Sequence, residues 1–250
     1  MDLRADRRAR IAVIAVFAMA TAVSACSGGG VFKREYEYEE ELYLALDGSA
    51  TLNVNASVDA LNALRGATFN PDPVARIDRD DLRSFFGGGS GPESADVSVS
   101  LARRDGRRFV HATVQVDSVE QLARLAPFSW SEYRLGRRQD AVEFRQRVGA
   151  PAATAAPAAW TGAEVVAFRM HLPSEIVFHN SPGGIERGNI LEWEQPLADR
   201  LAGTAVDIEV QLEPTSILAQ TLLLFGSTAV VALATLAGLA WWISRRGTDG

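Results

Sequence analysis

Residues 42–65 read LYLALDGSATLNVNASVDALNALR, and this stretch decides the fold. Apolar residues recur at every second position over 42–46 and again over 51–56, which is the period of a β-strand with one buried face. Asp47-Gly48 between them predicts a type I′ hairpin turn. Ser57 is a favourable helix N-cap, and apolar residues at helical spacing follow it as far as Gly66. The stretch therefore predicts a strand, a turn, a strand and a short helix in succession.

A similar pattern recurs further along the chain. Val97, Val99 and Leu101 alternate with serines, residues 104–107 form the turn, and residues 109–116 return. Ser118 then predicts a second helix, with Gln121 in the capping-box position. The two helix starts, residues 57–64 and 118–125, align closely. This fits either an ancient duplication or independent use of the same hairpin and cap chemistry.

The rest of the segment is also rich in strand patterns. We predict strands at 128–135, 141–148, 165–172, 176–179, 189–194 and 205–212, and a short helix at 78–86. Glycine-rich residues 87–92 and Ala/Pro-rich residues 149–159 predict loops. An open sheet needs a cover on its apolar face, and the helices at 58–65 and 119–126 supply one. We therefore predict an α+β domain over residues 35–214, a curved antiparallel sheet with short helices packed on one face.

The chain begins like an exported bacterial lipoprotein. Basic residues 1–10 precede an apolar run at 11–22 and the sequence Val23-Ser24-Ala25-Cys26. This arrangement resembles a signal peptide with a lipobox, which implies removal of residues 1–25 and acylation, for example by palmitate, at Cys26. Residues 26–34 are then a lipidated flexible neck, and the acidic run 35–41 is its solvated extension. An uncleaved signal anchor is the alternative.

A second membrane element is predicted at the other end. Residues 217–243 contain no charged side chain, Trp241 and Trp242 lie at the expected interface, and Arg245 and Arg246 follow. This pattern predicts a transmembrane helix at 216–243 and a cytoplasmic tail at 244–250. The helix is either a plain anchor or a contact with another membrane protein. The positive-inside rule places residues 35–214 outside the cytoplasm, so we predict a cell-membrane protein that is lipid-anchored and single-pass.

The charge of the chain argues against nucleic acid as a partner, and its cysteine content excludes an internal disulfide. The chain has 31 acidic and 25 basic residues, a net charge of −6, so nucleic acid is not an expected partner. The chain has one cysteine and cannot form an internal disulfide. Its stability therefore depends on an apolar core.

No pattern in the sequence indicates catalysis. There is no Gly-x-Ser-x-Gly elbow and no thiol besides Cys26, so we predict no enzyme activity, no catalytic residue and no cofactor. His171, His179 and Glu175 make a metal site conceivable, but solvent-facing strand histidines fit better, so we predict no metal. His111 has no neighbours at ligand spacing. Aromatic residues of the second half favour a packed core or, alternatively, a cavity for an apolar ligand. They are Phe128, Trp130, Tyr133, Phe144, Trp160, Phe168, Phe178 and Trp193.

The whole arrangement resembles the LppM-type lipoproteins of actinobacteria. The resemblance is carried by the lipobox at 23–26, the Asp-Gly hairpin at 42–50, the strand Gly188-Asn189-Ile190-Leu191-Glu192-Trp193-Glu194, the terminal helix, and Arg245-Arg246. It implies an extracytoplasmic α+β domain similar to small lipid-binding folds and a role with envelope lipids or glycolipids. It implies no catalytic residues.

Two functions remain open on these grounds. The first is a membrane-tethered lipoprotein that binds an apolar, lipid or glycolipid ligand of the envelope through residues that the sequence does not identify. The second is a non-enzymatic interaction module of an envelope protein complex. Both readings expect contact with membrane lipid through Cys26 and the C-terminal helix.

Overall fold

The computed structural model describes residues 35–89, 94–138, 140–151 and 160–246. The predicted signal peptide at 1–25, Cys26 and the rest of the neck at 26–34 lie outside the described residues. So do residues 90–92 and 152–159 of the two predicted loops, and the last four residues of the predicted tail. These predictions remain untested by the structure.

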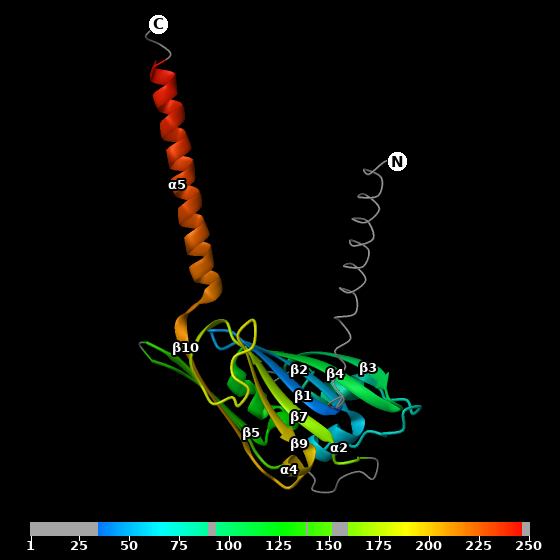
Figure 1. Cartoon of the computed structure of the whole chain (residues 1–250). Coiled ribbons are helices and arrows are strands. Elements are labelled where there is room, and N and C mark those ends of the chain that lie inside the picture. Colours follow the sequence, from blue (N-terminus) through cyan, green and yellow to red (C-terminus); the bar gives the residue numbers. More distant parts are fainter. Residues whose placement is uncertain (1–34, 90–93, 139, 152–159, 247–250) are drawn as a thin grey trace, which may run out of the picture. The chain divides into compact units, whose positions relative to one another are not determined.

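In the described chain, short helical segments separate groups of strands, and a long helix follows the last strand (Figure 1). The strands are β1 Glu35–Leu44, β2 Ala50–Ser57, β3 Asp96–Arg104, β4 Arg107–Val116, β5 Ser131–Arg137, β6 Val142–Val148, β7 Glu164–His171, β8 Ser174–His179, β9 Ile190–Pro196 and β10 Val206–Ser216. The α-helices are α2 Val58–Arg65, α3 Arg79–Phe85, α4 Leu197–Leu201 and α5 Ile217–Arg246, and the 3-10 helices are η2 Val119–Arg124 and η3 Ala126–Phe128. The predicted α+β class is confirmed.

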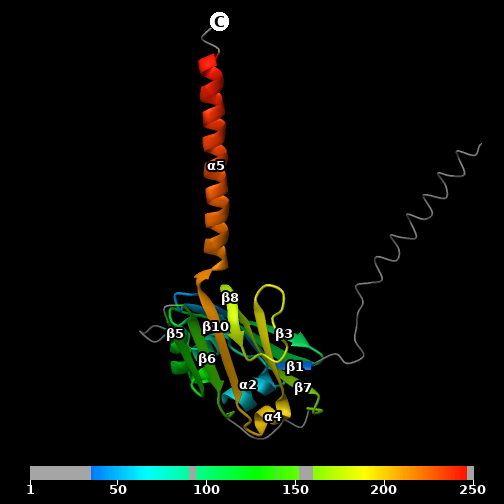
Figure 2. The same ribbon diagram turned by 60° about the vertical axis from the view of Figure 1, so that its left-hand side comes forward.

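The strands form two sheets instead of one. The larger has the order β3-β4-β2-β1-β7-β9, and the smaller has the order β5-β6-β10-β8; the two groups can be followed in Figures 1 and 2. Most neighbouring strands are antiparallel, as predicted. The pair β1 and β7 differs. Glu39 contacts Arg169 and Glu41 contacts His171, so these two strands run in the same direction.

One apolar core joins both sheets and the helices. Leu52 of β2, Phe144 of β6 and Leu61 of α2 are all fully buried in it. Helix α2 packs on β2 and β4, α4 packs on β7 and β9, and η2 lies against β5. Truncating a buried leucine such as Leu61 to alanine costs about 2–5 kcal/mol, so these contacts dominate the stability of the domain.

The first predicted unit forms as expected, apart from its turn. The Ser57 side chain accepts a hydrogen bond from the Ala60 amide at 3.0 Å, and Gly66 ends α2 with a left-handed φ of 68°. In the first hairpin only Gly48 has a positive φ (98°), so the prediction of a type I′ turn at Asp47-Gly48 is wrong. The loop is longer, because the Ala45 amide bonds to the Ser49 carbonyl at 2.9 Å. At the second hairpin both Asp105 and Gly106 have positive φ, as a type I′ turn requires.

The second predicted helix is a 3-10 helix with a different start. Ser118 makes no cap bond to the backbone, and its hydroxyl donates to Glu120. Glu120 in turn accepts the backbone amide of Leu135 on β5 at 2.8 Å. The predicted capping box with Gln121 is therefore wrong. The Glu120 carboxylate thus fastens η2 to the smaller sheet.

The prediction that the acidic run at 35–41 is a solvated extension of the neck is wrong. These residues belong to β1, an inner strand of the larger sheet, and are not a solvated extension of the neck. Glu37 and Glu40 are buried, with Glu40 only 3% exposed. Arg107 bonds Glu37 at 2.6 Å, and Arg65 pairs with Glu40. Buried carboxylates are tolerated because arginines from distant elements neutralise them.

The last described element is the predicted apolar helix. Within α5, residues Gln220–Trp242 are long and apolar enough to cross a membrane, with a mean hydropathy of 2.1. The helix continues to Arg246, so the first part of the predicted tail is helical. The expectation of a C-terminal helix able to span a bilayer is confirmed.

Candidate functional site

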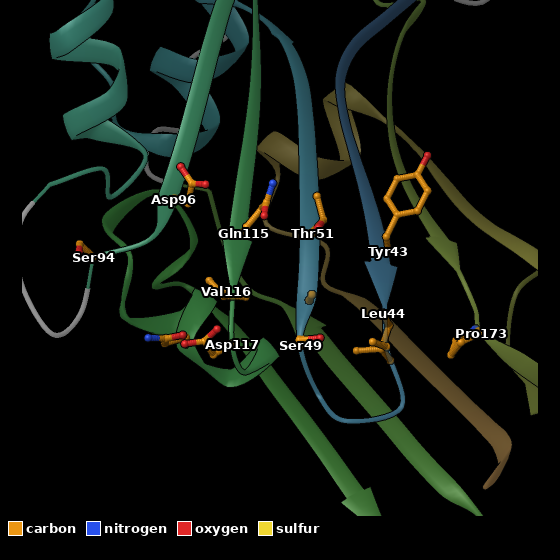
Figure 3. Close-up of a pocket in the computed structure, with 13 residues that line it drawn as sticks. Tyr43, Leu44, Ser49, Thr51, Ser94, Asp96, Gln115, Val116, Asp117 and Pro173 are labelled. Atoms are coloured by element: carbon orange, nitrogen blue, oxygen red, sulfur yellow. The ribbon is translucent and has the colours of Figure 1, made fainter. Parts of the chain in front are cut away.

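A groove opens at the end of the larger sheet where the loop at 45–49 joins β1 to β2, where β3 begins and where β4 ends (Figure 3). We call it the strand-end groove; its volume is about 620 Å³. It is lined by Tyr43, Leu44, Ala45, Ser49, Ala50, Thr51, Ser94, Asp96, Gln115, Val116, Asp117, Gln121 and Pro173. Pockets of roughly 300–1,000 Å³ are typical of small-ligand sites, so this groove is large enough for a ligand.

Four of the lining residues form one row across the sheet. Tyr43 of β1 pairs with Thr51 of β2, Thr51 pairs with Gln115 of β4, and Gln115 pairs with Asp96 of β3. Side chains alternate between the two faces of a strand, so residues in register share a face. The core residues of these strands point the other way, and the row therefore presents a phenol, a hydroxyl, an amide and a carboxylate to the outside.

Tyr43 is fixed in place by a neighbouring strand. Its ring stacks on His171 of β7, with centroids 4.0 Å apart and an interplanar angle of 11°. His171 Nε2 lies 2.6 Å from Glu41 Oε1, which holds the imidazole. Partial burial, and then the Glu41 carboxylate, raise the pKa of the Tyr43 hydroxyl. Tyr43 is 40% exposed, so a large aromatic side chain remains available at the groove.

The groove lies next to the start of the apolar helix. Pro173, one of its lining residues, accepts the backbone hydrogen bond of Ile217 at 3.0 Å. Ile217 is the first residue of α5. The adjacent residues Ser174 and Ser216 pair between β8 and β10. The groove is thus connected by one hydrogen bond to the point where the chain turns into its membrane-length helix.

A second, smaller hollow of about 380 Å³ lies on the same outer face. Its charged residues are paired with one another. Arg169 bonds Glu39 and Glu192 at 2.6 Å each, and these bonds raise the pKa of Arg169 although its burial lowers it. Asn55 donates to Glu39 at 2.7 Å. This hollow is therefore a hydrogen-bonded polar surface in which Arg169 is already engaged by two carboxylates.

The space between the sheets holds a cluster of charged and aromatic side chains. Arg65 donates from Nε to the Tyr38 hydroxyl at 2.6 Å and pairs with Glu40. Arg200 donates to the backbone carbonyls of Thr204, at 2.8 Å, and of residues 148 and 149. Burial and the nearby Arg65 lower the pKa of Arg200 to about 10. This cluster fills part of the interior where the sequence allowed an apolar cavity.

The aromatic residues divide as the packed-core interpretation expects, with one exception. Phe128, Phe144 and Phe168 are buried, and so are Tyr133 and Trp193. Trp130 and Trp160 pack against the same core. Phe178 differs, because it is 45% exposed on β8.

The histidines of the conceivable metal site are not brought together. His171 belongs to β7 in the larger sheet, whereas His179 and Glu175 belong to β8 in the smaller sheet. His171 contacts Glu41 instead. His111 is exposed on β4. Within the part of the chain that the structure describes, no group of three His, Cys, Asp or Glu residues is placed to hold a metal ion.

Sequence reasoning missed the residues of the groove. The positions of Thr51 and Gln115 are polar members of alternating strands, a signal shared with every solvent-facing strand position. What makes them a row is the strand order β3-β4-β2-β1, which no local pattern encodes. Cys26, the one site residue that the sequence did single out, lies outside the described residues.

Comparison with known proteins yields a weak structural neighbour. The folded domain of the LppM protein of Mycobacterium tuberculosis, solved by NMR, is similar with a TM-score of 0.40 and 13% sequence identity. The similarity covers 75% of this chain and 96% of that one. No protein-family model matches the chain, and no curated protein matches it in sequence.

Proposed function

We propose that this chain is a membrane-tethered lipoprotein that binds the polar headgroup of an envelope lipid or glycolipid in the strand-end groove. The observation that carries the proposal is the position of Pro173, which lines the groove and accepts the hydrogen bond of Ile217 at the start of α5. If α5 spans the membrane, this connection holds the groove close to the level of the lipid headgroups.

The lining favours a headgroup over an acyl chain. Hydroxyl, amide and carboxylate groups from Ser49, Thr51, Gln115, Gln121 and Asp117 surround the groove, and such groups orient a polar ligand by hydrogen bonds. An acyl chain would leave them without partners, at a cost of about 1–3 kcal/mol for each buried group. The sequence predicted an apolar, lipid or glycolipid ligand, and the lining of the groove favours contact with the polar headgroup of such a ligand.

Native mass spectrometry of the full chain, purified from its host membrane in mild detergent, tests the proposal. The chain should retain a lipid-sized mass. Replacing Thr51 by Trp fills the groove and should remove that mass. Ser98→Trp places the same side chain on the same outer face, at an exposed position of β3 outside the groove, and should leave the mass bound. Equal retention by both variants, or no retained lipid in any of them, contradicts the proposal.

A second function, the interaction module, is favoured by a different observation. Val177 and Phe178 are 61% and 45% exposed on β8, at the edge of the smaller sheet. Exposed apolar side chains on an edge strand are typical of protein contacts. Crosslinking in intact cells should then lose a partner in the V177S/F178S variant while lipid retention is unchanged.

A further inference from the structure

The charged side chains that line the strand-end groove have one sign. Asp96 and Asp117 contribute two carboxylates. The described residues that line the groove include no lysine, arginine or histidine. A lining of this kind attracts a cation and repels a phosphate or carboxylate of the ligand, and such complementarity governs specificity more than total affinity.

The aromatic side chain of the groove suits the same kind of ligand. Tyr43 presents a π system whose orientation is set by the stacked His171. Glu41, which contacts His171, adds negative charge beside this pair. An ammonium group over the face of a tyrosine within about 6 Å is attracted by the ring quadrupole. Tyr43 and Asp96 lie on β1 and β3, at the two ends of one row.

The middle of that row supplies hydrogen-bond acceptors. Thr51 offers a hydroxyl oxygen and Gln115 an amide oxygen, between the phenol on one side and the carboxylate on the other. A primary ammonium donates up to three hydrogen bonds, and all three kinds of oxygen accept them. Charge, ring and acceptors are thus arranged along one line.

We propose that the strand-end groove selects a ligand that carries an ammonium group. The inference rests on the proposed function, since it names the headgroup class of the same site. The ammonium belongs either to a membrane lipid, as in phosphatidylethanolamine, or to a free amine of the envelope. Anionic groups of the same ligand stay outside the lining.

Equilibrium dialysis of the full chain in uncharged detergent micelles tests this at neutral pH. Labelled ethanolamine should bind with roughly millimolar affinity, as expected for a probe of so few atoms, and glycerol and glycerol phosphate should not compete. Raising the ionic strength should weaken binding, because the carboxylates are exposed to screening.

A competition experiment separates a membrane lipid from a free amine as the source of the ammonium group. Bicelles that contain phosphatidylethanolamine or phosphatidylglycerol are added as competitors. Competition by the ethanolamine lipid alone identifies a lipid ligand, and binding of ethanolamine without competition by either lipid identifies a free amine.

Four variants assign the interaction to named side chains. Asp96→Asn should lower the affinity about two- to fivefold, the range of an exposed ion pair, and D96N/D117N roughly tenfold. Tyr43→Leu should also lower it about two- to fivefold, whereas Tyr43→Phe keeps the π face and should bind like the parent chain. Asp207→Asn removes a carboxylate from the smaller sheet and serves as the control of equal charge.

The outcomes separate this inference from the proposed function. Competition by glycerol or glycerol phosphate, or equal affinity of D96N and D207N, overturns the selection of an ammonium and leaves a headgroup groove intact. Failure of every probe to bind, together with no retained lipid in native mass spectrometry, overturns both.

Discussion

The guanidinium carbon of Arg65 lies 3.7 Å from the centroid of the Trp130 ring. Arg65 ends α2, and Trp130 lies between η3 and β5, so this contact joins a helix on the larger sheet to the first strand of the smaller one. The same guanidinium pairs with Glu40 of β1, and both side chains are buried. One arginine therefore links three separate parts of the chain.

Replacing Arg65 should destabilise the domain far more than replacing a surface arginine. Arg65→Met leaves Glu40 buried without its cation, which typically costs about 3–5 kcal/mol in the free energy of unfolding. Arg83 pairs with Asp80 on the exposed surface of α3, and Arg83→Ala should cost less than about 1 kcal/mol. Urea titration followed by tryptophan fluorescence measures the free energy of unfolding of both variants.

The double variant E40L/R65M should recover most of the stability lost in R65M, because apolar residues can replace a buried ion pair. A loss of less than about 1 kcal/mol for R65M would show that the pair is not structural.

Two glutamates should respond to pH with opposite signs. Burial raises the pKa of Glu37, against the hydrogen bond of Ser57 and the charge of Arg107. A carboxyl group with a raised pKa binds its proton more tightly in the folded chain, so its contribution to stability decreases as the pH rises from the unfolded value through the folded one. Glu37→Gln should remove that decrease. The free energy of unfolding of the variant, measured relative to that of the parent chain, should therefore increase as the pH rises.

Glu120 is the matched opposite case. Burial acts to raise the pKa of Glu120, but hydrogen bonds from Ser118 and from the Leu135 amide outweigh it and lower that pKa. Its contribution is present above the unfolded pKa and is lost as the pH falls through the folded one. Glu120→Gln should therefore cost more at neutral pH than in acid. Unfolding midpoints in urea between about pH 3 and pH 7 check both glutamates, and parallel pH profiles for the two variants would refute the assignment.

The apolar helix should fail to hold the membrane when a charge is placed at its centre. Val231→Arg adds about 2.5–3.5 kcal/mol to the cost of inserting the helix, whereas Val231→Leu adds nothing unfavourable. Alkaline carbonate extraction of host membranes should release part of the arginine variant and none of the leucine variant. The comparison is best made in the Cys26→Ser background, where a lipid anchor cannot compensate.

Lipidation at Cys26 stays a prediction with a direct test. Mass analysis of the chain from its host should find residues 1–25 absent and an acylated Cys26 at the new N-terminus. The Cys26→Ser variant should lack the acyl mass. An intact N-terminus with an unmodified thiol in the parent chain would favour the signal anchor.

Local signals were sufficient for the paired strands of the two hairpins and for the first helix, and insufficient for the turn at Asp47-Gly48 and for the acidic strand. Ser57 and Gly66 act within one helix, so their chemistry can be read from neighbouring residues. Glu40 looks like a surface residue because its neutralising partner, Arg65, is 25 positions away. Burial of a charge depends on such distant partners, and a run of glutamates is for this reason read as solvated unless the pairing is known.

The candidate site depends even more on contacts between residues that are far apart in the sequence. The strand pattern predicts that Thr51 and Gln115 are polar and outward, but only the order of strands brings them beside each other. The contact of Pro173 with the start of α5 depends on the return of β10 between β6 and β8. Neither relationship has a counterpart in the spacing of residues along the chain.

The direct passage from β10 into α5 has a mechanical consequence. Ile217 follows Ser216 without an intervening residue, and β10 is hydrogen-bonded to a strand on each side. A pull on the helix is therefore borne along the strand by two hydrogen-bond ladders that must yield together in shear. A load applied at this end should rupture the domain at a higher force than one that peels an edge strand such as β3 away, so the C-terminal end is the one suited to carry tension.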